Sequence, residues 1–142
     1  MAKLIICRGI PASGKSTWAE QQKYAVVVTR DDIRMQFNCT GAGWSKEKEL
    51  DFVVPEMNYR ISEGLKAGLT VISADTNLNP ITVARLINLA QSLGAEYEIK
   101  DFDTPLEVCI ERDSEREYPW KVGEVKIREY YELWEKRNAV SS

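Results

Sequence analysis

The feature that most constrains the fold of this sequence is the stretch GIPASGKST, which follows an apolar run and precedes an amphipathic segment. It matches G-x-x-x-x-G-K-[ST], with Gly9, Gly14, Lys15 and Ser16 at the fixed positions. The glycines let backbone N–H groups point inward at a phosphate, while the positive end of the next helix faces the anion. The alternative is a simple glycine turn before a helix. A predicted strand before the motif and a predicted helix after it favour phosphate binding.

Two side chains of this motif are expected to contact a bound nucleotide. Lys15 would place a positive charge at the β- and γ-phosphates, and the Ser16 hydroxyl would bind Mg²⁺. ATP and Mg²⁺ are therefore the predicted cofactors. The motif alone does not separate an ATPase, a GTPase and a small-molecule kinase, although the sequence has no N-K-x-D-like guanine-recognition segment. The predicted nucleotide cradle consists of Gly9, Ile10, Pro11, Ala12, Ser13, Gly14, Lys15, Ser16 and Thr17.

Strand-like and helix-like segments alternate along the chain. Such alternation predicts a parallel β-sheet with helices on both faces, the α/β fold of P-loop NTPases of the adenylate-kinase type. Ligands of such sheets bind beyond the carboxyl ends of the strands. We expect one domain over residues 1–142, with a lid segment near 112–123. Strands are predicted at 4–8, 25–29, 69–74 and 97–102, and helices at 16–24, 46–67 (interrupted near Pro55), 80–93, 105–116 and 122–138.

Composition excludes several other classes of protein. The net charge of −3 provides no global positive field for long duplex nucleic acid. The absence of histidine removes Ser-His-Asp catalysis and zinc sites with histidine ligands. The three cysteines are odd in number and widely spaced, which predicts reduced thiols in a cytosolic compartment. No apolar stretch has the length of a membrane helix, so no membrane association is expected.

The stretch VVVTRDDIR places charged residues directly after the second predicted strand, at the ligand end of the sheet. If a helix begins there, Asp31 and Arg34 share one helical face. The carboxylate could accept the proton of an attacking hydroxyl, and the guanidinium could bind a substrate phosphate through two N–H groups. The alternative is that Asp31 or Asp32 caps the helix and Arg34 is a surface charge.

Two further positions carry charge near the expected ligand end. Asp75 ends the third strand, where P-loop proteins hold a carboxylate near Mg²⁺; alternatively, it is a turn or cap residue. Arg112 and Arg116 are four residues apart and would share one helical face, which suits a lid that closes over charge. The alternative for this pair is a solvated face on which they pair with Glu111 and Glu115.

Aromatic residues offer candidate stacking surfaces for adenine or an acceptor base. Trp44, Tyr118 and Trp120 lie in loop-like segments, where stacking contributes roughly 1–3 kcal/mol per base in single-strand binders. Trp18 and Trp134 lie in predicted helices and are expected to pack on the core.

Four motifs, in this order and spacing, resemble the kinase domain of bacteriophage polynucleotide kinase: GIPASGKSTW, RDDIR, DTNLNP and ERDSER. The resemblance covers most of the chain and is weak over residues 36–68. It implies transfer of the γ-phosphate of ATP to the 5′-hydroxyl of DNA or RNA. It also implies that Asp31 is the general base and that Arg34 binds the phosphate next to the acceptor nucleoside.

The resemblance assigns further roles. Lys15 and Ser16 match the P-loop pair of that family, and Asp75 matches its Asp at the end of the third strand. Thr76 would contact the acceptor phosphate, and Arg116 would clamp the transferring phosphoryl group. Arg112 is a candidate nucleotide contact beside Arg116.

The implied partners are ATP and the 5′-OH ends of single-stranded or nicked nucleic acid. The implied location is the cytoplasm, of an infected host if the chain is of phage origin. The sequence has no D-x-D-x-T phosphatase motif, which predicts a kinase without 3′-phosphatase activity. Two alternatives stay open: a kinase for a nucleoside, sugar or metabolite, and a nucleotide-binding regulator without an acceptor.

Overall fold

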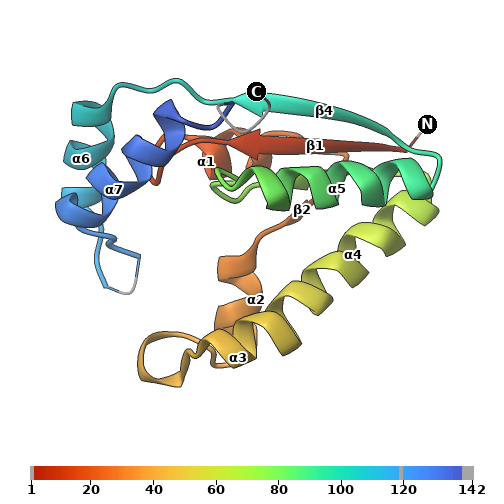
Figure 1. The fold of residues 1–142 in the computed structure, drawn as a ribbon, viewed down its shortest axis with the longest axis horizontal. Coiled ribbons are helices and arrows are strands. Elements are labelled where there is room, and N and C mark those ends of the chain that lie inside the picture. Colours follow the sequence, from red (N-terminus) through yellow and green to blue (C-terminus); the bar gives the residue numbers. More distant parts are fainter. Residues whose placement is uncertain (1, 119, 139–142) are drawn as a thin grey trace.

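The computed structural model describes residues 2–118 and 120–138, and these residues form one four-stranded parallel sheet (Figure 1). The strand order is β2-β3-β1-β4, so β1 and β3 are central. The predicted parallel sheet is therefore confirmed, with strand ends within two residues of those expected. The strands are β1 Lys3–Arg8, β2 Ala25–Val28, β3 Thr70–Ser73 and β4 Glu96–Asp101.

Helices cover both faces of the sheet, as predicted (Figure 1). The helices are α1 Lys15–Glu20, α2 Arg30–Gln36, the 3₁₀ turn η1 Gly41–Gly43, α3 Lys46–Lys48, the π-helical turn η2 Glu49–Val53, α4 Val54–Lys66, α5 Pro80–Ser92, α6 Leu106–Ser114 and α7 Glu124–Glu135.

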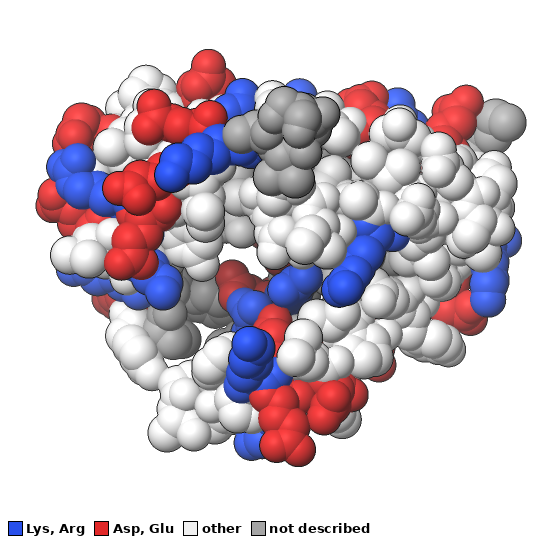
Figure 2. Space-filling model, in the orientation of Figure 1, with Lys and Arg blue, Asp and Glu red and all other residues white. Residues whose placement is uncertain are grey.

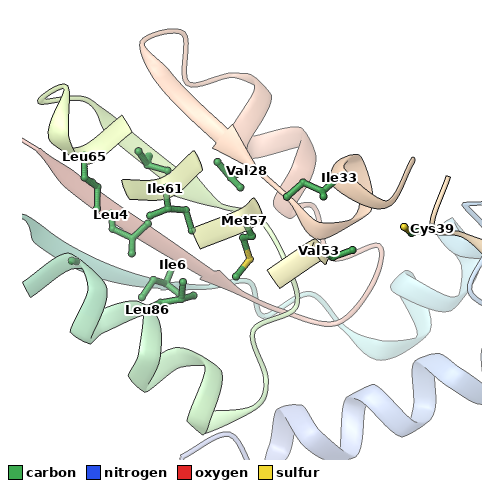
Figure 3. Close-up of a cluster of buried hydrophobic side chains, with 12 residues drawn as sticks. Leu4, Ile6, Val28, Ile33, Cys39, Val53, Met57, Ile61, Leu65 and Leu86 are labelled. Atoms are coloured by element: carbon green, nitrogen blue, oxygen red, sulfur yellow. The ribbon is translucent and has the colours of Figure 1, made fainter. Parts of the chain in front are cut away.

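The core follows the two-residue alternation of the strands. Leu4 and Ile6 point toward α4 and α5, where they pack with Ile61 and Leu86 in the cluster of Figure 3. Cys7 lies on the opposite face and packs against α1. A separate apolar cluster under α6 and α7 holds these two helices beyond the strand ends. The sheet thus presents its carboxyl ends to a space bordered by α2 on one side and by α6 and α7 on the other.

The long segment expected at 46–67 contains the predicted interruption near Pro55. Proline has no N–H to donate to the carbonyl of Asp51, so the ordinary helical hydrogen bond cannot form there. The backbone instead makes the π turn η2 just before α4. Glu49, its first residue, is consequently buried.

Three predicted helices extend more than one residue beyond those observed. The first ends at Glu20 rather than at residue 24, because the N–H groups of Gln21 and Gln22 bond to carbonyls only three residues back and tighten the chain into a turn. The helices expected at 105–116 and 122–138 are trimmed at both ends. Pro119, within the predicted lid segment, lies outside the described residues.

The thiols of Cys7, Cys39 and Cys109 are all free and buried. Across residues 2–118 and 120–138, no helix combines the length and apolar character needed to cross a bilayer.

Candidate active site

The cradle between β1 and α1 is built on close backbone packing. A Cβ atom at Gly9 would lie 2.6 Å from the Ser13 hydroxyl oxygen and 3.1 Å from Phe102 Cβ. Gly14 has a φ angle of 103°, in the left-handed region that favours glycine. A larger residue at either position would disrupt the loop. These two constraints explain why the chain has glycine at the first and sixth positions of the motif.

Lys15 lies folded into this cradle. Its Nζ donates hydrogen bonds to the carbonyl oxygens of Gly9 (2.9 Å) and Ile10 (2.8 Å) and to the Ser13 hydroxyl (3.3 Å). Burial lowers the pKa of Lys15 to about 8. Because the carbonyls already hold the ammonium at the floor of the loop, its charge is available to a phosphate that enters the cradle.

A cavity of about 420 Å³ opens over the cradle and is lined by residues 12–18 with Gln21, Thr104, Arg112 and Arg116. The Thr104 hydroxyl donates to the Ser13 carbonyl at 2.7 Å, and Arg112 Nη1 donates to the Ala12 carbonyl at 3.2 Å. The loop after β4 and helix α6 therefore brace the cradle from behind. Gly9 and Ile10 act in this site through their carbonyls, since neither lines the cavity.

A second cavity, of about 380 Å³, adjoins the first. Figure 2 shows this face hollowed between the lid segment and α2, with acidic and basic side chains at the rim. The residues predicted for the acceptor side line it together, namely Asp31, Arg34, Asp75 and Thr76. Lys15, Ser16 and Arg116 line both cavities. The two cavities therefore share Ala12, Lys15, Ser16 and Arg116, and the last three were predicted to contact the γ-phosphate or Mg²⁺.

Asp75 is held at the end of β3 by a strained loop. Asn77 adopts a φ of 47°, and its Nδ2 donates to the Cys7 carbonyl (2.8 Å) and the Ser73 hydroxyl (3.1 Å). These bonds join the ends of the two central strands. Asp75 is thereby directed inward, where its Oδ1 accepts the backbone N–H of Arg30 at 2.9 Å.

The second carboxylate oxygen of Asp75 bears on whether this site could hold a metal ion. Oδ2 is buried and has no hydrogen-bond partner among the described residues. Burial raises the pKa of Asp75 to about 6. The described part of the chain has no cluster of three acidic, cysteine or histidine ligands. Ser16 and Asp75 nevertheless line the same cavity, and Mg²⁺ characteristically takes few protein ligands and keeps several waters. These residues therefore fit a magnesium ion bound mainly by phosphate and water oxygens.

The helix that carries Asp31 is capped by another residue. Thr29 is the N-cap of α2, and its hydroxyl accepts the backbone N–H of Asp32 at 3.0 Å. The alternative in which Asp31 or Asp32 caps this helix is therefore wrong, because Thr29, directly before the first helical residue, is the cap. The Asp31 side chain is 70% exposed and accepts a 2.7 Å bond from Arg34 Nη1. Asp31 is thus free to contact a ligand in the second cavity.

Arg34 is not a free surface charge. Its Nε and Nη2 donate to the two carboxylate oxygens of Glu49 at 2.8 and 2.6 Å. Burial alone would raise the pKa of Glu49, but bonds from Arg34 and from Trp44 Nε1 outweigh it and lower that pKa. Glu49 was not among the predicted site residues, because nothing in the local sequence pattern shows that a π turn directs it toward α2.

The two predicted lid arginines do not share a helical face. Helix α6 ends at Ser114, and Arg116 lies in the following turn, where its N–H bonds to the Asp113 carbonyl at 3.0 Å. Arg116 Nη1 lies 3.8 Å from Asp113 Oδ1, and Arg112 reaches the cradle. Among the described residues, the predicted pairs with Glu111 and Glu115 are not formed.

Asp113 organises the segment that was predicted to be a lid, and it was not among the predicted site residues. Its carboxylate is almost fully buried and accepts the backbone N–H groups of Val122 and Gly123, both at 2.8 Å. These bonds fold the chain after Arg116 back onto α6. The signal for this role was present in the ERDSER stretch, but the pattern alone does not distinguish Asp113 from its exposed acidic neighbours.

The aromatic residues divide into three groups. Trp120 lines the second cavity, whereas Trp44 and Tyr118 line neither cavity. Trp134 is buried under α6 and α7, as expected. Trp18 packs edge-on against Phe102 with ring centroids 5.8 Å apart, and it also lines the first cavity.

Two curated relatives of this chain are named as kinases. The chain is 25% identical over 150 residues to a putative bifunctional polynucleotide kinase/RNA ligase of Autographa californica nuclear polyhedrosis virus, which covers 96% of this chain and 21% of that protein. It is 30% identical over 140 residues to the L-seryl-tRNA(Sec) kinase of Methanococcus maripaludis, covering 93% of this chain and 52% of that protein. The chain thus spans about half or less of the length of these relatives.

A solved structure of the Pnkp1/Rnl/Hen1 RNA repair complex shares the fold, with a TM-score of 0.80. The sequence identity is 22%, and the match covers 98% of this chain and 46% of that one. The profile of the AAA_33 family, described as an AAA domain, matches residues 4–132. The chain therefore belongs to the AAA_33 family and has a P-loop kinase-like fold.

Proposed function

We propose that this chain is an ATP-dependent polynucleotide 5′-hydroxyl kinase. The observation that carries the proposal is the meeting of two cavities at Lys15, Ser16 and Arg116. One cavity contains the phosphate cradle, and the other contains a carboxylate and a guanidinium in contact with each other. A nucleotide-binding protein without an acceptor has no need of the second arrangement.

The residues suggest a division of labour for in-line transfer. ATP would lie in the first cavity with its γ-phosphate at the junction, where Lys15 and Arg116 stabilise the negative charge of the moving phosphoryl group. Asp31 would orient the 5′-hydroxyl and accept its proton as the new phosphate ester bond forms. When bound, Mg²⁺ neutralises charge on the phosphates, and Ser16 with Asp75 would hold it.

Arg34 would select acceptors that carry a phosphate beside the reacting nucleoside. Glu49 fixes the Nε and Nη2 side of its guanidinium, and Nη1 faces Asp31. The guanidinium is therefore preorganised, and a phosphate in the second cavity would meet donors that are already in position. Thr76, on the wall of the same cavity, is a second candidate contact for that phosphate.

A second candidate is a kinase for a hydroxyl other than a polynucleotide 5′ end. The similarity to the L-seryl-tRNA(Sec) kinase supports it, since the name of that protein indicates a different acceptor. In that case Asp31 would orient the hydroxyl of another alcohol and accept its proton. A nucleotide-binding regulator without an acceptor is the third candidate function.

The test is a transfer assay with γ-labelled ATP, Mg²⁺ and a panel of acceptors. The panel contains 5′-OH DNA and RNA oligonucleotides, a 3′-nucleotide, seryl-tRNA, free nucleosides and sugars. We expect label at oligonucleotide 5′ ends. If label appears only on the other acceptors, the chain is a kinase but its substrate is not a polynucleotide 5′ end. Bound ATP with no labelled product would favour the regulator.

A further inference from the structure

Trp44 is an exposed aromatic residue that is nevertheless held rigidly. Its side chain is 47% exposed, yet its Nε1 donates a 2.9 Å hydrogen bond to Glu49 Oε1. The indole is fixed by its polar edge, which leaves ring surface open to a ligand.

The loop around Trp44 is built to hold this position. Gly43 approaches the Asn38 carbonyl so closely that a Cβ atom would lie 2.5 Å from that oxygen. The Trp44 N–H bonds to the Gly41 carbonyl at 3.1 Å, and Lys48 Nζ bonds to the Gly43 carbonyl at 2.9 Å. The position of the ring is therefore set by the fold of the loop rather than by an incidental surface contact.

Trp44 is joined to the acceptor side through one oxygen atom. Glu49 Oε1 accepts both Trp44 Nε1 and Arg34 Nε, at 2.9 and 2.8 Å. Arg34 lines the second cavity, whereas Trp44 does not. The ring is thus not part of the cavity lining, but it is bonded to the same carboxylate oxygen as the guanidinium. A strand whose phosphate contacts Arg34 would meet the ring with its next nucleotide.

We propose that Trp44 is a stacking platform for the base of the second nucleotide of a single-stranded acceptor, aligned with Arg34 by their shared carboxylate Glu49. This inference deepens the proposed kinase function and depends on it. Stacking on an aromatic face is tolerant of base identity. The platform would therefore improve the binding of acceptors with two or more nucleotides, whatever their sequence.

The test compares acceptors of one and two or more nucleotides. In Trp44→Ala, the KM for a 5′-OH oligonucleotide should rise roughly 5- to 150-fold, the range that loss of one stacked base predicts. The KM for a 3′-nucleotide and the KM for ATP should be unchanged. Trp44→Phe retains a ring and should retain most of the oligonucleotide preference. Tyr59→Ala is the matched control, because Tyr59 is an exposed aromatic on α4 without a contact to Glu49.

A binding measurement provides a second readout. The tryptophan emission of Trp44 is the difference between the emission of the wild type and that of Trp44→Phe. Addition of single-stranded oligo(dT) should quench this difference. Equal KM changes for both acceptor lengths, or no change, would overturn the platform while the kinase proposal stands. A wild type that phosphorylates no oligonucleotide, and whose Trp44 fluorescence does not respond to it, would overturn both.

Discussion

Asp75 and Arg30 join the end of β3 to the first turn of α2, with the Asp75 carboxylate 2.9 Å from the Arg30 backbone nitrogen. This bond fixes α2, which carries Asp31 and Arg34, relative to the end of β3. It leaves the other carboxylate oxygen buried without a partner among the described residues. The site therefore retains an unfavourable buried charge that bound ligands can offset.

Asp75 should make the ligand-free protein less stable as the pH rises. Burial raises its pKa to about 6, so the folded state binds its proton more tightly than the unfolded state does. Its stabilising contribution is complete below about pH 4 and is lost as the pH rises through 6. Relative to Asp75→Asn, the free energy of unfolding of the wild type should fall by roughly 2–3 kcal/mol between pH 4 and pH 8. Urea titrations across this range measure the difference.

Asp32→Asn is the control for that series, because Asp32 is exposed on the same helix as Arg30. A flat difference between Asp75→Asn and the wild type would contradict a raised pKa at position 75.

Lys15 should take up a proton when ATP binds near pH 8. Burial lowers its pKa to about 8, whereas a bound polyphosphate favours the charged form. Calorimetry in two buffers of different ionisation enthalpy should show uptake of about half a proton per ATP at pH 8, and more at higher pH.

Lys15→Arg should abolish this uptake, because a guanidinium stays protonated throughout. If the binding enthalpy of the wild type differs between the two buffers no more than that of Lys15→Arg does, Lys15 takes up no proton. Lys15 would then be fully charged before ATP binds.

Arg34 should discriminate between acceptors with and without a 3′-phosphate. In a variant that lacks the Arg34 charge, the KM for an acceptor with a 3′-phosphate should rise roughly 10- to 100-fold, because a charged hydrogen bond is lost. The KM for an unphosphorylated acceptor should change little. Arg34→Ala alone would remove the two guanidinium bonds to the buried Glu49 carboxylate, and breaking such a pair is strongly destabilising. The combined variant Arg34→Gln with Glu49→Gln removes both charges together. An equal KM change for the two acceptors would exclude phosphate recognition by Arg34.

Asp113 should control the order of the lid segment. Asp113→Ala removes the acceptor for two backbone N–H groups, which predicts a loss of roughly 1–3 kcal/mol in local stability. Trypsin should then cleave faster after Arg116 and Lys121, and a non-hydrolysable ATP analogue should protect these sites in the wild type. Glu115→Ala, an exposed neighbour, should leave cleavage unchanged. Slow cleavage in Asp113→Ala would show that other contacts hold the lid.

The fold and the cradle were predictable because they depend on local patterns. Continuous apolar runs mark strands covered on both faces, and the glycine spacing of the cradle is set by backbone geometry. The partners of Arg34 and Arg116 were not predictable in the same way. Glu49 reaches Arg34 from fifteen positions away only because a π turn precedes Pro55, and Asp113 acts by receiving the backbone of a returning loop. Both roles arise from tertiary contacts between segments whose local patterns are ordinary.

The central claim is that Asp31 accepts the proton of a 5′-hydroxyl, and single-turnover transfer from γ-labelled ATP to a 5′-OH oligonucleotide tests it most directly. Asp31→Asn should lower the transfer rate roughly 10²- to 10⁴-fold while ATP binding stays nearly intact. Asp32→Asn, the adjacent carboxylate, should transfer at close to the wild-type rate. Equal rates for Asp31→Asn and the wild type, or no transfer to oligonucleotides by the wild type, would contradict the claim.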